Sequence, residues 1–88
     1  ARLRAWLERH KEYPHRARVR RQQGTALLHF VVDANGRVLS HRIDRTSGYD
    51  LLDEAVEDMI ARAQPLPPPP PDMGRRLEIT VPVQFVLR

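Results

Sequence analysis

Apolar and polar residues alternate most regularly at the end of the chain, over residues 77–88. Every odd-numbered position from Leu77 to Leu87 carries a large apolar side chain, and only Val86 interrupts the complementary series at the even-numbered positions. A period of two is typical of a β-strand that buries one face. The pattern therefore predicts a strand over residues 77–88.

A second alternating stretch over residues 25–33 is followed by Asn35-Gly36, which favours a tight type I′ turn. We therefore predict a hairpin over residues 25–45 with a two-residue loop. The cross-strand pairs expected from that loop are Val32 with Leu39, Phe30 with His41 and Leu28 with Ile43. This register gives both strands one shared apolar face, with Ala26 on the same side.

Two segments have the period of an amphipathic helix. The first lies within residues 1–13 and ends at Tyr13-Pro14, because the residue before a proline is disfavoured in the α region. Its apolar stripe is Leu3, Trp6, Leu7 and His10. A polar stretch is expected from there to Gly24.

The second helix is predicted over residues 50–63, with Asp50 as its N-cap and Pro65 as its stop. Asp53 and Glu54 lie in the first turn, where the helix dipole favours negative charge. The predicted buried stripe is Leu52, Ala55, Val56, Met59 and Ala63.

Residues 64–76 form a proline-rich connector that includes the run Pro67 to Pro71. Such a run favours an extended polyproline II conformation. We interpret it as a stiff spacer within the domain; the alternative is a ligand for an aromatic groove on another protein.

These elements predict one α+β domain over residues 1–88, in the order α-β-β-α-β. The second helix carries the chain to a third strand that is parallel to the second and antiparallel to the first. A right-handed crossover then gives the strand order 2-1-3, with the last strand at the edge. Both helices are expected on one face, because three strands alone bury too little apolar surface.

Pro82 indicates which side of the last strand is free. A proline lacks the N–H that a sheet ladder needs, so it is tolerated where that group would face outward from an edge. The backbone groups of Thr80, Gln84 and Val86 then also face outward, because orientation alternates along a strand. An open edge can accept a strand from a partner, or it can merely be blunted by Pro82 and Arg88.

The charge is concentrated near the start of the chain. Residues 1–24 contain eight basic and two acidic side chains, whereas residues 25–88 contain seven basic and nine acidic. This segment is either a patch for an anionic partner or a solvated helix face. The absence of cysteine excludes disulfides and thiolate chemistry, and no apolar run approaches the roughly 20 residues that span a bilayer.

Catalytic and metal-binding patterns find little support. The hydroxyl residues follow no nucleophile or phosphate-loop motif, and in the predicted register His29 and His41 point to opposite faces of the hairpin. The acidic residues Asp53, Glu54, Glu57 and Asp58 have helical spacing and are interpreted as a solvated face. We expect no enzymatic activity, no metal and no cofactor.

From about residue 10 to residue 88 the chain resembles the C-terminal domain of the energy transducer TonB. The resemblance lies in an ordered set of short motifs rather than in any single one. They are Tyr13-Pro14-His15-Arg16-Ala17, Phe30-Val31-Val32-Asp33, Asn35-Gly36-Arg37-Val38, Arg45-Thr46-Ser47-Gly48, Leu52-Asp53-Glu54-Ala55 and Val81-Pro82-Val83-Gln84-Phe85. His41 departs from the family pattern, which usually has an aliphatic residue there, and the proline run is longer than the family needs.

The resemblance implies a periplasmic domain of a protein anchored in the inner membrane of a Gram-negative bacterium. Such domains bind the TonB box of outer-membrane receptors for siderophores, haem or cobalamin by strand addition, and transmit energy from the proton gradient. The missing N-terminal part would contact the ExbB/ExbD complex, and the missing initiator methionine suggests that an anchor was cut away. The partner-contacting residues it implies are Tyr13, Pro14, Arg16, Arg18, Thr80, Val81, Pro82, Val83, Gln84, Phe85 and Val86.

Three alternatives stay open at this point. One is a TolA-like domain of related architecture. The second is nucleic-acid or anionic-surface binding through Arg16, Arg18, Arg20 and Arg21, although no aromatic residues interleave them as in single-strand binders, and nucleic acid is not the expected partner. The third is a weak homodimer that pairs edge to edge.

Overall fold

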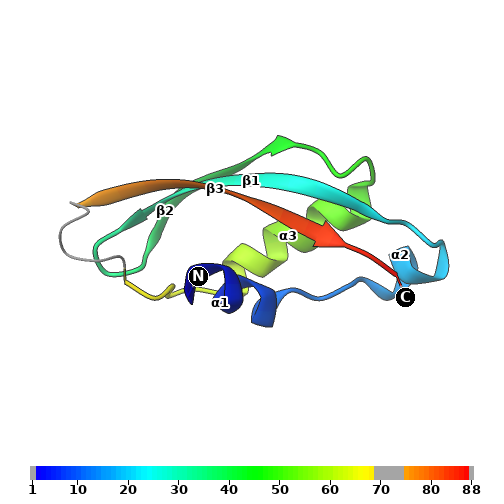
Figure 1. The fold of residues 1–88 in the computed structure, drawn as a ribbon, viewed down its shortest axis with the longest axis horizontal. Coiled ribbons are helices and arrows are strands. Elements are labelled where there is room, and N and C mark those ends of the chain that lie inside the picture. Colours follow the sequence, from blue (N-terminus) through cyan, green and yellow to red (C-terminus); the bar gives the residue numbers. More distant parts are fainter. Residues whose placement is uncertain (1, 69–74, 88) are drawn as a thin grey trace.

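The computed structural model describes residues 2–68 and 75–87. In chain order its elements are α1 (Arg2–His10), α2 (His15–Val19), β1 (Gly24–Asp33), β2 (Val38–Arg45), α3 (Asp50–Arg62) and β3 (Arg76–Phe85). The strands form one sheet in the order β2-β1-β3, and the helices lie on one of its faces (Figure 1). The predicted strand order, the edge position of the last strand and the packing of the two long helices are confirmed. The five-residue helix α2 is an addition, in the stretch expected to be merely polar.

The core is built on β1, which pairs antiparallel with both β2 and β3. Every second side chain of β1 is almost completely buried, namely Ala26, Leu28, Phe30 and Val32. The predicted stripe of α3 packs against this row, with Ile60 as a further member. Val81, Val83 and Phe85 of β3 complete the core, so the alternation in both strands identified the buried face correctly.

Helix α1 ends at His10, three residues earlier than the end predicted. Its terminal carbonyl is satisfied from outside the helix, because an Arg62 guanidinium nitrogen donates to the His10 carbonyl oxygen at 2.8 Å. Trp6 Nε1 likewise donates to the Ala63 carbonyl oxygen at 2.7 Å. These two bonds join α1 to the C-terminal end of α3, and residues 11–14 continue without helical structure.

The hairpin turn differs from the prediction of a two-residue type I′ loop. The Gly36 N–H donates to the Asp33 carbonyl at 3.1 Å, and the Asp33 N–H donates to the Arg37 carbonyl at 2.9 Å. Of the loop residues, only Gly36 has a positive φ, +84°. This is a type I turn followed by a left-handed glycine, and it makes the loop one residue longer.

The extra loop residue shifts the register near the turn. Val32 pairs with Val38, and the predicted pairing with Leu39 is wrong; the Leu39 side chain is 45% exposed. An irregularity between Val31 and Val32 absorbs the difference, so that Phe30 opposite His41 and Leu28 opposite Ile43 are as predicted.

Two aspartates stabilise loops with their side chains. Asp33 Oδ1 accepts from the Arg37 and Asn35 N–H groups, both at 2.9 Å, and these bonds, Arg37 first, lower the pKa of Asp33. The N-cap of α3 is Tyr49 and the predicted cap, Asp50, is its first helical residue. Asp53 instead reaches back to the loop before the helix.

The Asp53 carboxylate accepts three hydrogen bonds from that loop. Ser47 donates through Oγ at 2.6 Å and through its N–H at 2.9 Å, and Thr46 donates through Oγ1. Partial burial alone would raise the pKa of Asp53, but the bonds from Ser47 and Thr46 outweigh it and lower the pKa below its ordinary value of 3.8.

The connector is fixed at its first turn by the hairpin. Leu66 is buried, and its N–H donates to the Gly36 carbonyl at 2.8 Å. Gln64 Oε1 accepts from the Val38 N–H at 3.3 Å. Pro69 to Pro71, most of the predicted polyproline run, lie outside the described residues.

Strand β3 ends at Phe85 rather than continuing to residue 88. It pairs with β1 at ten successive positions, and the last pair is Gly24 with Phe85, where β1 begins. Beyond that point no strand remains for it to pair with. The Leu87 N–H instead donates to Gln23 Oε1 at 3.0 Å, and Arg88 lies outside the described residues.

Replacing Gly36 by alanine should destabilise the domain by about 2 kcal/mol or more. An added Cβ would lie 2.0 Å from the Leu66 carbonyl oxygen, at a φ that disfavours L side chains. Gly48→Ala is the matched control, because Gly48 also has a positive φ but has open space around it. It should cost about 1 kcal/mol. Equal losses in urea denaturation would show that the contact with Leu66 contributes nothing.

Asp53→Ala should lower the free energy of unfolding at neutral pH by about 1–2 kcal/mol, because it leaves the Thr46 and Ser47 donors without their carboxylate. Since the pKa of Asp53 is lowered by folding, its stabilising effect is complete above the unfolded pKa and is lost as pH falls through the folded one. The difference in the free energy of unfolding between wild type and variant, measured by urea denaturation, should therefore become smaller below about pH 4. Asp58→Ala, an exposed change on the same helix, should show no such gap at any pH.

Candidate partner-binding edge

The outer edge of β3 is unpaired within the described part of the chain, because β1 lies on its other side. Pro82 lies opposite Leu27 and has no N–H to give to β1. Gln84 is two residues further on, so its backbone groups have the same outward orientation. Thr80, Pro82 and Gln84 are all exposed.

Two hydrogen bonds agree with this orientation. Lys11 Nζ donates to the Gln84 carbonyl oxygen at 2.6 Å from outside the sheet. On the opposite side, the Leu87 N–H is directed to Gln23, which immediately precedes β1. The main-chain N–H and C=O groups of the even-numbered residues of β3 therefore point outward, and those of the odd-numbered residues point toward β1.

The other predicted partner-contacting residues of β3 have buried side chains. Val81, Val83 and Phe85 are 7%, 3% and 1% exposed. They hold the strand on the core and do not present side chains to a partner. Val86, just beyond the strand, is 53% exposed.

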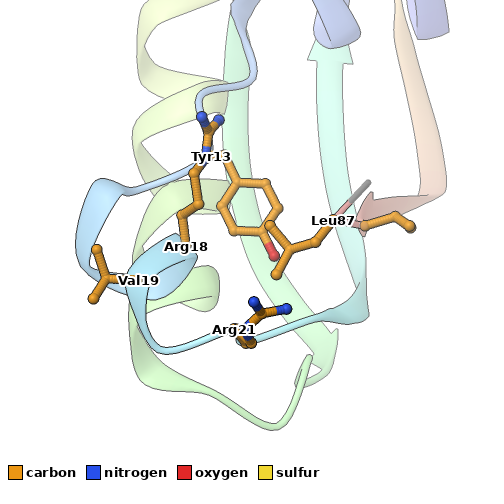
Figure 2. Close-up of a pocket in the computed structure, with 6 residues that line it drawn as sticks. Tyr13, Arg18, Val19, Arg21 and Leu87 are labelled. Carbon is orange, nitrogen blue, oxygen red and sulfur yellow. The ribbon is translucent and has the colours of Figure 1, made fainter.

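An open hollow of about 520 Å³ lies at the end of this edge (Figure 2). Its lining is Tyr13, Arg18, Val19, Arg21, Val86 and Leu87. Val19 is 66% exposed, so the hollow combines accessible aliphatic surface with two guanidinium groups. Neither arginine forms an ion pair with any residue that the structure describes.

Tyr13 connects the hollow to the edge strand. Its hydroxyl donates to the Gln22 carbonyl, and its ring meets the Phe85 ring edge-on, with 5.4 Å between centroids. The Arg18 guanidinium lies 5.5 Å from the centre of the same ring. Figure 2 shows the Arg18 side chain beside this ring and the Arg21 side chain below its hydroxyl end. These contacts fix the Tyr13 side chain, so it forms part of the wall of the hollow.

Sequence reasoning missed the element that positions these arginines. Pro14 is the N-cap of α2, and the Arg18 N–H donates to the Pro14 carbonyl at 3.0 Å. Ala17, the one buried residue of α2, lies four positions after Tyr13 and was the available signal. Arg21 follows the helix in a left-handed conformation, with φ 57°, which is uncommon for a residue other than glycine.

The remaining candidates lie apart from the hollow. Arg16 is exposed and is not among the residues that line it. Pro14 borders a different hollow on the α3 side, with Glu54 and Asp58 nearby. The structure therefore brings together Tyr13, Arg18 and Val86, but not Pro14 or Arg16.

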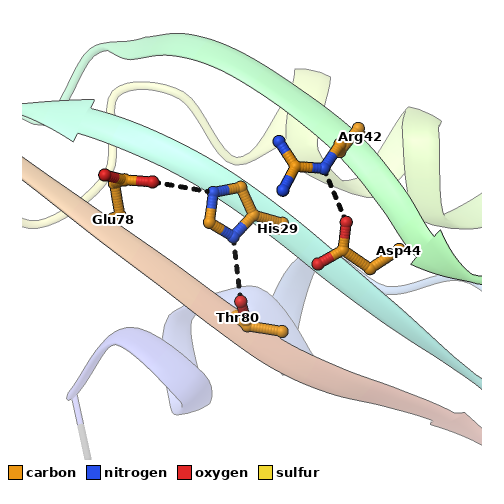
Figure 3. Close-up of polar contacts among 5 residues, drawn as sticks. All are labelled: His29, Arg42, Asp44, Glu78 and Thr80. Atoms are coloured by element: carbon orange, nitrogen blue, oxygen red, sulfur yellow. Dashed lines mark hydrogen bonds and ion pairs between the residues drawn. The ribbon is translucent and has the colours of Figure 1, made fainter.

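The histidines of the hairpin lie on opposite faces of the sheet, as predicted. His29 lies on the face away from the helices, where Nδ1 is 2.9 Å from Thr80 Oγ1 and Nε2 is 3.2 Å from Glu78 Oε1 (Figure 3). His41 lies 3.1 Å from Glu57 of α3, on the helix side. In residues 2–68 and 75–87, no three His, Asp or Glu side chains are grouped as metal ligands. No helix in the same residues has the length and apolarity to cross a bilayer.

Comparison with known proteins gives consistent matches. Residues 9–87 match the family model described as Gram-negative bacterial TonB protein C-terminal. Protein TonB of Pseudomonas putida is 44% identical over 80 residues, which cover 91% of this chain and 33% of that protein. Protein TonB of Pasteurella multocida is 39% identical over 83 residues, or 94% of this chain and 32% of that protein. The chain thus spans about a third of the length of these curated relatives.

Solved structures show the same fold. The solution structure of Helicobacter pylori TonB-CTD residues 179–285 has a TM-score of 0.84 at 23% identity, covering 99% of this chain and 78% of that one. The structure of HasB CTD has a TM-score of 0.64 at 35% identity, covering 99% of this chain and 68% of that one. With the family model matching nearly all of its length, the chain belongs to the TonB C-terminal domain family of Gram-negative bacteria.

Proposed function

We propose that this domain binds the TonB box of outer-membrane receptors in the periplasm by adding it as a strand to the outer edge of β3. The observation that carries the proposal is the outward main chain of Thr80, Pro82 and Gln84 on a strand that has no bulge and whose outer edge is unpaired among the described residues. In strand addition the main chain supplies affinity and alternate side chains supply specificity.

The geometry favours β3 over β2, the other edge of the sheet. The pairing of β3 with β1 has no irregularity over ten positions, whereas that of β2 has two. On the face away from the helices, β2 also carries the ion pair between Arg42 and Asp44, at 2.6 Å (Figure 3). Bulges and charged side chains are typical of edges that are protected against pairing.

The hollow beside Tyr13 suits the part of the receptor that flanks the added strand. Its guanidinium groups fit a carboxylate, and Val19 and Val86 fit an aliphatic side chain. We assign the eight basic side chains of residues 1–24 the role of steering an acidic receptor surface toward the end of the domain that carries this hollow.

The wider role follows from family membership and forms part of the same proposal. The full-length protein would be anchored in the inner membrane, where ExbB/ExbD would supply energy from the proton gradient. The domain would transmit that energy to receptors for siderophores, haem or cobalamin, without enzymatic activity of its own. The family match favours this over a TolA-like role.

Gln84→Pro should weaken binding of a TonB-box peptide about tenfold, because it removes an N–H that faces outward from β3. The sheet should stay intact, because the hydrogen bonds between β3 and β1 do not involve that N–H. The probe is a synthetic peptide carrying the TonB box of an outer-membrane receptor, titrated by NMR against the ¹⁵N-labelled domain. In the wild type we expect shifts at residues 80–86 and near Tyr13.

The matched control is Gln84→Ala, which removes the side chain but keeps the main-chain donor; its affinity should stay near that of the wild type. Strand addition at β3 is wrong if the peptide shifts avoid residues 80–86. It is equally wrong if the proline variant, shown to be folded, binds as tightly as the alanine variant.

Arg18→Gln and Arg21→Gln should slow association with an acidic TonB-box-flanking peptide and flatten its salt dependence. Arg37→Gln removes the same charge at the hairpin tip, at the opposite end of the molecule from α2, and should have little effect (Figure 1). Stopped-flow association rates at several salt concentrations provide the measurement. If all three substitutions slowed association equally, the effect would come from net charge alone and not from the position of Arg18 and Arg21.

The same variants distinguish receptor binding from the alternative that this domain binds nucleic acid. Titration with a single-stranded oligonucleotide should give weak binding or none, whereas a genuine phosphate site would show a salt slope near one per phosphate neutralised. A slope of several units, reduced in Arg18→Gln, would favour that alternative over receptor steering.

A further inference from the structure

The Gln84 carbonyl, a main-chain acceptor on the proposed binding edge, is already occupied by a side chain of the same molecule. Lys11 Nζ donates to it at 2.6 Å, across 73 positions in the sequence. We propose that Lys11 caps the edge of β3 in the free domain and must be released from Gln84 before a partner strand can pair there. This inference rests on the proposed function and adds an internal competitor to it.

The ammonium is held at this position by three groups. Besides the Gln84 carbonyl, it meets Glu8 Oε2 at 2.9 Å and lies 5.5 Å from the centre of the Phe85 ring. The Lys11 side chain is only 21% exposed, whereas that of Glu8 is 57% exposed. A lysine side chain with so little exposure is held in one position by its contacts.

The early end of α1 places Lys11 there. The helix ends at His10, where Arg62 donates to the last carbonyl, and the following residues contact the end of β3 through Lys11 at Gln84 and Tyr13 at Phe85. Lys11 is the only lysine in the sequence, against fourteen arginines. A compact ammonium can occupy a single carbonyl, whereas a planar guanidinium favours two-pronged acceptors.

Competition follows from the geometry of strand addition. A partner strand paired at this position directs an N–H at the Gln84 oxygen, which already accepts from the Lys11 ammonium at 2.6 Å, so the two donors compete for one main-chain acceptor. The outward main-chain groups of Thr80 accept or donate no side-chain hydrogen bond among the described contacts, so pairing can begin at Thr80 before Lys11 leaves Gln84. A charged side chain on an open edge also hinders pairing between copies of the domain.

Lys11→Met tests the proposal, because it keeps the length of the side chain and removes the ammonium. We expect it to bind the synthetic TonB-box peptide about threefold to tenfold more tightly than the wild type, since a charge-assisted hydrogen bond no longer competes. Loss of a positive charge would by itself weaken binding to an acidic partner, so the two effects have opposite signs.

Two controls accompany this variant. Arg9→Met removes the same charge from α1, where the guanidinium lies 5.8 Å from the Trp6 ring centre, and its affinity should equal or fall slightly below that of the wild type. Lys11→Arg keeps the charge and should stay closer to the wild type than Lys11→Met. An affinity of folded Lys11→Met equal to or below that of the wild type would overturn the proposal.

A measurement without peptide distinguishes this failure from that of the proposed function. The carbonyl ¹³C resonance of Gln84 in the free domain should move upfield in Lys11→Met, as expected for loss of a hydrogen bond, and should not move in Arg9→Met. An unmoved Gln84 resonance contradicts the cap even if the peptide binds at β3. A moved resonance with peptide shifts elsewhere supports the cap and contradicts strand addition.

Discussion

Strand β1 can bury one row of side chains only if both of its edges are paired and one of its faces is covered. Leu28 and Phe30, in the middle of that row, are completely buried. Their burial requires α3 above them, β2 on one side and β3 on the other, and α1 then closes the gap beside α3. In a chain of 88 residues this row lies at the centre of the single apolar core, so the other elements are positioned around it.

The same requirement produces an exposed edge. Three strands with β1 in the centre leave two outer edges, and the protein treats them differently. The pairing of β2 with β1 is irregular and β2 is charged, while β3 pairs with β1 without a bulge and carries Pro82 and a carbonyl capped by Lys11. An edge that is regular, and that a single side chain caps among the described residues, is protected from pairing between copies without being permanently blocked.

The sequence predicts much of this fold because the period-two strands and Pro82 each depend on local chemistry. The turn at Gly36 differs from the prediction because an Asn-Gly pair fits both a two-residue loop and a type I turn with a bulge. In the second, which the structure has, Asp33 accepts hydrogen bonds from the Gly36 and Arg37 N–H groups. Helix α2 was missed because one buried alanine is too weak a pattern. The Lys11 contact joins residues 73 positions apart, which no local pattern reveals. Of the predicted partner-contacting residues, Tyr13, Arg18 and Val86 line one hollow, whereas Pro14 lines another, because the turn after α1 and the short helix α2 set their positions.

The uninterrupted ladder between β3 and β1 has a mechanical consequence. A tension applied along a strand added to β3 would act parallel to both strands, so the hydrogen bonds that the odd-numbered residues of β3 make along the whole ladder would share the force in shear. A pull across the sheet would instead separate the pairs one at a time from Phe85 or Arg76. The domain should therefore resist force strongly in one direction and weakly in the other, so the angle of the pull would decide whether the partner or this domain gives way first.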